Sequence, residues 1–188
     1  MVLIVLSASL LVTTGLFHGC SRNAATDEQI NIVYINWTED VAMTHVLAVL
    51  LEDRLGYNVD LTMADVAPAY TSLASGSQDL FLDAWLPNTH APYWERYGDR
   101  LVDLGRLYED ARIGLVVPAD APGQSIGDLR QYRDAYNGRI IGIDAGAGIM
   151  RRSEEALKAY GLHNYELVAS SEPAMTAALR DAVEEERP

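Results

Sequence analysis

Cysteine is nearly absent from this sequence, since Cys20 is the only one in 188 residues. A single cysteine excludes an internal disulfide and a thiolate zinc site. The histidines are few and none of them shows metal-ligand spacing; they are His18, His45, His90 and His163. We therefore predict neither a metal ion nor a cofactor.

Positive charge is also scarce. Lysine and arginine together number 14 against 27 acidic residues, so the formal net charge is −13. A field of this sign repels nucleic acid and anionic lipid, and we exclude nucleic acid as a partner on that ground. Solubility or a saline habitat explains the acidity without any partner. Because 49% of the residues are hydrophobic, the chain has enough apolar surface to fold.

Motifs of nucleophilic catalysis are missing as well. The sequence has no Gly-x-Ser-x-Gly elbow and no Ser-x-x-Lys arrangement. An enzyme could still use Asp83, Asp144 or Glu39 as acid or base, but no spacing pairs a nucleophile with a base. We therefore predict that the protein is not an enzyme, and a turnover assay would decide between the alternatives.

Long hydrophobic runs are lacking, and the N-terminal apolar segment is short. Residues 1–19 carry no charged side chain, and their apolar run falls below the roughly 20 residues that span a bilayer. This pattern predicts a signal peptide over residues 1–19. Cys20, between Gly19 and Ser21, predicts a lipid attachment site and a periplasmic or cell-surface location; a plain signal peptide or a misassigned start is the alternative. Residues 20–29 are expected to be a polar tether.

Patterns of strands and helices alternate after the tether, which predicts an α/β fold with mostly parallel sheets. Strands are expected at residues 30–35, 57–62, 79–84, 101–104, 112–117, 139–143 and 165–168. Helices are expected at residues 41–55, 67–75, 90–97, 125–132 and 149–160, with a last one starting near Pro173. The apolar face expected for the helix 41–55 consists of Met43, Val46, Leu47, Leu50 and Leu51. A crossing near residues 118–123 divides the chain into a first lobe, 30–117, and a second lobe, 118–188.

Tryptophans stand directly after two of the expected strands. Trp37 follows the first strand and Trp85 the third. Ligands of open parallel sheets bind beyond the carboxyl ends of the strands. An indole face there attracts a cation, by about 0.5–2 kcal/mol depending on solvent exposure. Glu39 would add to the preference for cations or only favour the helix start. The alternative is that each tryptophan packs a lobe, as we expect for Trp94 within its helix.

A glycine-rich turn is expected between the strand 139–143 and the helix 149–160. Its bare backbone lets a ligand approach, and N–H groups at a helix N-terminus attract an anion. A dinucleotide fingerprint requires a third glycine where Arg151 stands. A carboxylate therefore fits better than a nucleotide, although a simple tight turn would explain the glycines equally well.

Several of these segments resemble one family. They are Ile-Asn-Trp-Thr-Glu (35–39), Val-Asp-Leu-Thr (59–62), Asp-Ala-Trp-Leu-Pro-Asn-Thr-His (83–90), Ile-Gly-Leu-Val-Val-Pro (113–118), Gly-Ile-Asp-Ala-Gly-Ala-Gly-Ile-Met (142–150) and Ser-Ser-Glu-Pro-Ala-Met (170–175). In these segments the chain resembles the substrate-binding proteins of glycine betaine and proline betaine ABC importers. The resemblance extends over nearly all of residues 30–186. It implies a two-lobed periplasmic-binding-protein fold of type II that closes over its ligand.

The resemblance also implies which residues bind each end of the ligand. Trp37 and Trp85 would be walls of an aromatic cage for the trimethylammonium group. The N–H groups of Gly148 and Ile149, with the His90 side chain, would hold the carboxylate. Glu39 and Ala147 are expected as further lining residues. The implied partners are a small quaternary-ammonium solute and the permease subunits of an ABC importer, and contact with a membrane is expected only through a lipid anchor at Cys20.

Alternatives remain at this stage. Choline, carnitine and proline betaine are possible ligands, although choline has no carboxylate. A ligand-sensing module of the same fold is the other alternative. In the family the chain continues into a Gly-Trp-Thr-Pro-His-Trp segment whose first tryptophan supplies a third wall, whereas this sequence stops at Pro188. We therefore expect a truncated member with an incomplete second half, which binds betaine weakly or not at all.

Overall fold

A parallel pair of strands organises the first half of the computed structural model, which describes residues 28–188. β1 (Gln29–Tyr34) runs beside β2 (Asn58–Met63), with Ile32 opposite Leu61. Parallel strands need a crossover, and here a helix supplies it. That helix, α1 (Thr38–Leu50), continues as a π-helical turn, Leu51–Leu55. Gly56 ends it in the left-handed conformation, as the sequence predicts.

The buried face of α1 differs from the predicted one. Val46 and Leu50 are 62% and 48% exposed, so the predicted apolar face is wrong at these positions. The most buried residues of the helix are Asp40 and Thr44. Asp40 accepts a hydrogen bond from the Ile35 N–H at 2.7 Å and one from the Thr44 hydroxyl at 3.1 Å. These bonds satisfy the buried polar groups, and hydrophobic periodicity cannot predict them.

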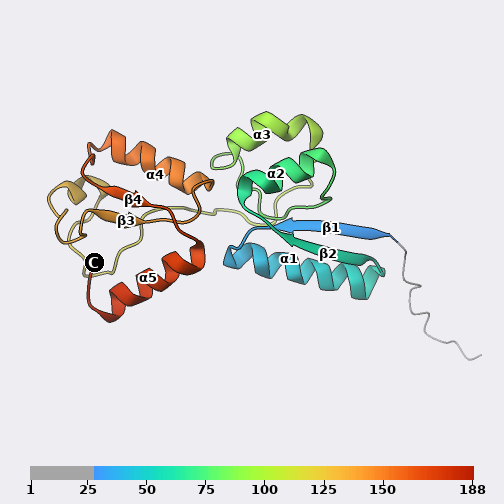
Figure 1. The fold of residues 1–188 in the computed structure, drawn as a ribbon, viewed down its shortest axis with the longest axis horizontal. Helices are drawn as coiled ribbons and strands as arrows, with labels where there is room; N and C mark the ends of the chain where they lie inside the picture. The colour runs from blue at the N-terminus through green and yellow to red at the C-terminus, as the bar shows by residue number, and fades with distance from the viewer. Residues whose placement is uncertain (1–27) are drawn as a thin grey trace, which may run out of the picture.

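Two further helices cover the other side of the β1–β2 pair (Figure 1). α2 (Val66–Ser75) buries Val66, Ala69 and Tyr70 almost completely. α3 (Ala91–Tyr97) is short, and His90 stands at its N-cap. A 3₁₀ turn, Gly98–Arg100, follows α3. We call β1, β2, α1, α2 and α3 the first lobe.

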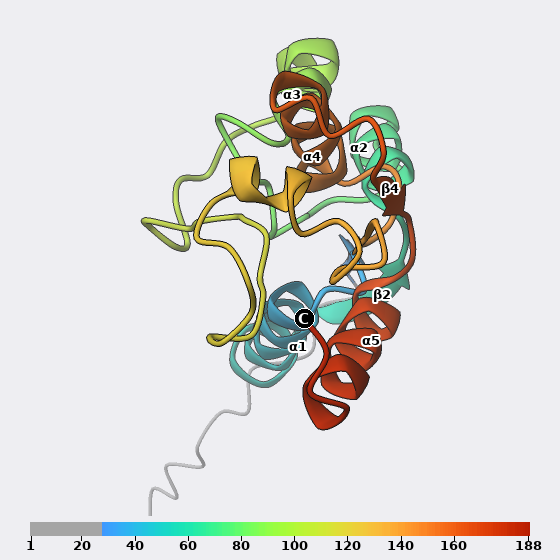
Figure 2. The same ribbon diagram turned by 90° about the vertical axis from the view of Figure 1, so that its left-hand side faces the viewer.

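The second lobe repeats this layering on a smaller scale. β3 (Arg139–Ile141) pairs with β4 (Glu166–Val168) in parallel. α4 (Gly148–Ala159) lies on one side of the pair and α5 (Glu172–Glu184) on the other (Figures 1 and 2). Leu129, on the 3₁₀ segment Ile126–Arg130, forms a small core with Leu162 and Tyr165.

Three predicted strands are wrong in whole or in part. Segments 101–104 and 112–117 form no strand, and segment 79–84 contributes only a single parallel bridge between Leu80 and Ile32. These segments are apolar enough for strands, but a strand also needs a neighbour for its ladder of hydrogen bonds. Within residues 28–188 none pairs with segment 101–117, whose Val102, Leu104 and Val116 are at least 75% exposed.

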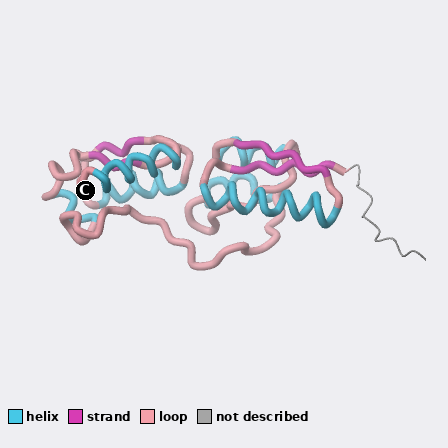
Figure 3. Tube along the Cα trace, turned by 90° about the horizontal axis from the view of Figure 1, so that it is seen from below, coloured by secondary structure: helices cyan, strands magenta, loops and turns pink. Residues whose placement is uncertain are grey.

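The two lobes are joined by one long loop (Figure 3) and share a core cluster. Ile35, Trp37 and Tyr70 of the first lobe pack in this cluster with Ala147 and Met150 of the second. The exact division at residue 117 stays a prediction. In the part of the chain that the structure describes, no helix is long and apolar enough to cross a membrane. The predicted signal peptide and Cys20 lie outside the described residues.

Candidate functional site

A cavity of about 170 Å³ lies where the two lobes meet. Ligand sites for drug-sized molecules measure about 300–1,000 Å³, so this cavity suits a much smaller solute. Every residue that the sequence analysis proposed for the ligand lines it. They are Trp37, Glu39, Trp85 and His90 from the first lobe and Ala147, Gly148 and Ile149 from the second.

Trp37 both packs in the protein interior and lines the cavity. It is the N-cap of α1, three residues after the end of β1, and only 6% of it is exposed. Its indole N–H donates to the Asp144 carboxylate of the second lobe at 3.2 Å. The residue packs in the shared core and also lines the cavity, so its packing is compatible with the predicted role as a cage wall, which stays a prediction.

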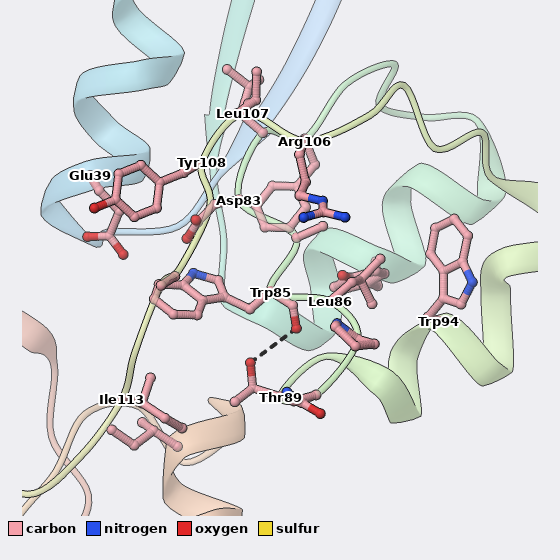
Figure 4. A pocket seen from close by; sticks show the side chains of 18 of the residues that line it. Glu39, Asp83, Trp85, Leu86, Thr89, Trp94, Arg106, Leu107, Tyr108 and Ile113 are labelled. Carbon is pink, nitrogen blue, oxygen red and sulfur yellow. Dashed lines mark hydrogen bonds between the residues drawn. The ribbon is translucent and has the colours of Figure 1, made fainter.

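Trp85 and His90 are tied into one tight turn. The Trp85 carbonyl accepts from the His90 N–H at 3.0 Å and from the Thr89 hydroxyl at 3.2 Å, the bond drawn in Figure 4. In return, the Trp85 N–H donates to Nδ1 of His90 at 3.1 Å. The turn therefore fixes the imidazole of His90 relative to the backbone of Trp85.

These hydrogen bonds also assign the protons of His90. The side chain is 1% exposed, and burial lowers its pKa to about 4, so it is neutral at pH 7. Nδ1 accepts the Trp85 N–H, and the Tyr70 hydroxyl lies 3.3 Å from the same nitrogen. A neutral imidazole whose Nδ1 accepts carries its proton on Nε2. His90 therefore offers an N–H donor from Nε2.

Gly148 is the first residue of α4 and touches the first lobe closely. A Cβ atom at this position would lie 2.4 Å from the carbonyl oxygen and from the Cβ of Thr89. Only glycine allows the N-terminus of α4 to approach the Trp85–His90 turn this closely. The first N–H groups of α4, among them those of Gly148 and Ile149, have no acceptor within the helix. They are donors at the positive end of the helix dipole.

Acidic side chains surround the aromatic end of the site. Burial, and after it the nearby carboxylates of Asp40 and Glu39, raise the pKa of Asp83 to about 7. Burial likewise raises the pKa of Asp40 to about 6. Oδ2 of Asp83 and Nε1 of Trp85 are buried without a hydrogen-bond partner in the structure. This end of the site is negative or readily becomes so, which favours a cation.

Hydrogen bonds across the lobes border the cavity. The Glu172 carboxylate, at the start of α5, accepts from the Thr38 hydroxyl at 2.6 Å and from the Thr38 N–H at 3.2 Å. The Tyr93 hydroxyl donates to the Gly146 carbonyl at 2.9 Å. In these contacts, and in that between Trp37 and Asp144, the first lobe donates and the second accepts.

Some lining residues were not predicted as site residues, namely Thr89, Ile113, Ile143 and Glu172. Ile113 and Ile143 carry no signal beyond their apolar character. Glu172 had a local signal, because Ser171 caps the helix that begins with it and Pro173 follows. That signal indicates a helix start, and it gives no hint of a contact with Thr38.

A larger hollow of about 2,100 Å³ adjoins the cavity on the side of α1 and the irregular segment 101–115. Both spaces are lined by Glu39, Trp85, Thr89, Ile113 and Ile149. Figure 4 shows the Trp85 indole between Asp83 and Ile113 at this border. The hollow is far too large for a small solute to be enclosed, so we place the candidate site in the smaller cavity. Among residues 28–188, no cluster of histidine, cysteine and acidic side chains could hold a metal ion.

Solved structures of similar proteins share this fold. A glycine betaine/L-proline-binding protein, ProX, from Borrelia burgdorferi is 38% identical with a TM-score of 0.81, over 85% of this chain and 60% of that one. Lactococcal OpuAC, solved closed with glycine betaine, is 38% identical with a TM-score of 0.79, over 86% of this chain and 62% of that one. Both are periplasmic binding proteins of type II, and the predicted fold class is thereby confirmed.

A curated relative and a family model agree with this. The glycine betaine/carnitine transport binding protein GbuC of Listeria monocytogenes is 34% identical over 91 residues, which are 48% of this chain and 30% of that protein. The chain thus spans less than two thirds of the length of each of these proteins. The model of the substrate binding domain of the ABC-type glycine betaine transport system matches residues 28–188. The chain belongs to this family of substrate-binding domains.

Proposed function

We propose that this chain is a solute-binding component of an ABC importer, and that its cavity holds glycine betaine or a close quaternary-ammonium relative. The observation that carries the proposal is the meeting of four predicted residues of the first lobe and three of the second around one small cavity. The family supports binding rather than catalysis. The lobes are taken as residues 30–117 and 118–188.

The positive end of the ligand lies against Trp37 and Trp85 in this proposal. A trimethylammonium group has no N–H to donate, so it gains from π faces and from nearby negative charge rather than from hydrogen bonds. Each cation–π contact contributes about 0.5–2 kcal/mol, more as water is excluded. The carboxylate of Glu39, and that of Asp83 when it is ionised, make the surroundings negative.

The negative end lies at the start of α4. In this proposal the N–H groups of Gly148 and Ile149 and the Nε2–H of His90, which line the same cavity, donate to one carboxylate. Hydrogen bonds to a charged group contribute about 1.5–3 kcal/mol each, which makes this end the one that rejects choline. Neutral His90 suits this role because it donates a hydrogen bond to the carboxylate. It carries no positive charge that would compete with the ligand's cationic head for the aromatic cage.

The division of the ligand contacts between the two lobes implies that ligand binding favours closure of the lobes. The rings belong to the first lobe and the amides to the second, so a zwitterion makes all its contacts only when the lobes are together. The closed form is then the one handed to the permease. The proposed location is outside the cytoplasmic membrane, with Cys20 as the lipid anchor.

Calorimetric titration of the purified protein tests the proposal. We expect saturable binding of glycine betaine within the millimolar range, with carnitine and proline betaine weaker and choline weakest. Trp85→Ala should weaken binding about thirtyfold, from the loss of a partly desolvated cation–π contact and its packing. Trp94→Ala, as the matched control, should leave affinity within twofold of wild type. From the sequence, weak binding and no binding remain alternatives: weak saturable binding supports the proposal, and absence of saturable binding of all four ligands would contradict it.

A further inference from the structure

Asp144 stands out because its carboxylate contacts the cage without lining the cavity. One oxygen, Oδ2, accepts the indole N–H of Trp37 at 3.2 Å across the lobes. The other, Oδ1, is buried and has no side-chain hydrogen-bond partner in the structure. No ion pair within residues 28–188 includes Asp144, and so no cation neutralises it there. The side-chain partner of this carboxylate is therefore Trp37, a wall of the candidate cage, and the backbone N–H groups of Asp144 and Gly146 in its own turn support it from the other side.

Backbone hydrogen bonds build Asp144 into the second lobe. Its carbonyl accepts from the Ala147 N–H at 3.0 Å, which closes the turn that leads into α4. The same turn carries Gly146, whose carbonyl accepts from Tyr93, and then Gly148. The residue that touches Trp37 is thus built into the turn whose amides are proposed to hold the ligand carboxylate.

The direction of the hydrogen bond matters for the indole. An indole N–H lies in the plane of the ring, so an acceptor at its edge fixes the ring orientation and leaves the π face on the cavity side free. A negative charge at the edge also adds to the attraction for a cation on the face. A charged acceptor holds the ring more strongly than a neutral one.

We propose that Asp144 is a positioning residue for cation recognition: its carboxylate orients the Trp37 indole when the lobes close and so couples the grip on the positive head to closure. The proposal rests on the proposed function of the cavity. It deepens that function, because the second lobe then acts on both ends of the ligand, on the carboxylate directly and on the cation through Trp37.

The test compares two ligands that share the cationic head. Glycine betaine carries a carboxylate and tetramethylammonium does not. Asp144→Ala is expected to weaken the binding of both by about tenfold, the loss of one charge-assisted hydrogen bond. Asp144→Asn keeps the shape and an acceptor but removes the charge, and should weaken both by about threefold. A double-mutant cycle with Trp37→Phe, which keeps an aromatic ring without the N–H, should show no further loss from Asp144→Ala.

Asp181→Asn is the matched control, since it makes the same change at an exposed position of the second lobe. Thermal unfolding of each variant separates loss of fold from loss of binding. A loss confined to glycine betaine would overturn the proposal, because Asp144 would then act only on the amide turn. Full loss from Asp144→Ala in the Trp37→Phe background would also overturn it. If the wild-type protein binds neither ligand, the proposed function fails together with this inference; if it binds both and Asp144→Ala changes nothing, only the inference fails.

Discussion

The two lobes contribute to the cavity in different ways. The first lobe has the larger core, with Ile32, Val66 and Tyr70 at most 1% exposed, and it presents rings and carboxylates. The second lobe has a small core, in which only Leu162 is as deeply buried, and it presents main-chain N–H groups. The first lobe therefore depends on which side chains it carries, whereas the second depends on how closely its backbone can approach.

The strongest way to break this arrangement is to block the approach of the backbone. Gly148→Ala places a Cβ atom 2.4 Å from backbone and side-chain atoms of Thr89, so the lobes cannot reach the observed contact. Overpacking of this kind costs about 3 kcal/mol, and we expect glycine betaine binding to weaken on the order of a hundredfold in calorimetry. Gly146→Ala, on the same turn, meets nothing closer than 3.6 Å and should bind within twofold of wild type. Equal losses in the two variants would show that the turn tolerates no side chain for another reason.

Asp83, a buried acid of the first lobe, should affect the stability of the fold rather than the closure of the lobes. The pKa of Asp83 is raised above its ordinary value to about 7, chiefly by burial and then by Asp40 and Glu39. The folded state therefore holds a proton that the unfolded state has released, and stability present below pH about 4 is lost as pH rises through about 7. Asp83→Asn removes this loss. We therefore expect the free energy of unfolding, measured with urea at pH 8, to be about 2 kcal/mol higher for the variant than for wild type.

The same comparison at pH 4 should show little difference between Asp83→Asn and wild type. Asp181→Asn, at an exposed position, provides the control and should not change the slope of stability with pH. A destabilised Asp83→Asn variant at pH 8 would mean that a hydrogen bond from the neighbouring Trp85 indole to the ionised carboxylate outweighs the cost of burying it.

How much of this could be read from the sequence depends on how local each signal is. Trp37 after an expected strand and the glycine-rich turn before α4 are local sequence patterns. The sequence predicts the residues of both as site residues. The bond from Trp37 to Asp144 joins residues 107 apart and that from Thr38 to Glu172 joins residues 134 apart. Neither bond can be predicted from a sequence window of ten residues. Only the arrangement of the lobes brings these partners together.

Errors in the fold have equally specific causes. Hydropathy placed Val46 and Leu50 inside, whereas the hydrogen bonds of Asp40 bring a polar face of α1 inward. Segment 112–117 has the composition of a buried strand, but composition does not supply a neighbouring strand.

His90 sharpens the comparison because it is a first-lobe side chain that serves the negative end. His90→Leu removes the Nε2–H donor, and we expect glycine betaine binding to weaken about tenfold while tetramethylammonium binding changes less than twofold. Competition titrations with both ligands measure the ratio. His45→Leu, the same change at an exposed position of α1, is the control. Equal losses for both ligands would instead place His90 on the cation side.

The smallest effect is expected at the rim. Glu172→Gln keeps an acceptor for the Thr38 hydroxyl, now 2.6 Å away, but removes the charge at a partly exposed position. Such contacts contribute about 0.7 kcal/mol, so closure and binding should weaken about threefold. Glu184→Gln, at the far end of α5, makes the same change without a contact to the first lobe and should bind like wild type. A loss as large as that of Gly148→Ala would show that the rim rather than the amide turn controls closure.

The grip of both lobes on one zwitterion is tested most directly by a crystal structure of the protein with glycine betaine. We predict the trimethylammonium group against the indoles of Trp37 and Trp85, and the carboxylate within hydrogen-bond distance of the Gly148 and Ile149 nitrogens and of Nε2 of His90. A ligand bound in the larger hollow beside α1, or held by one lobe alone, would contradict this account.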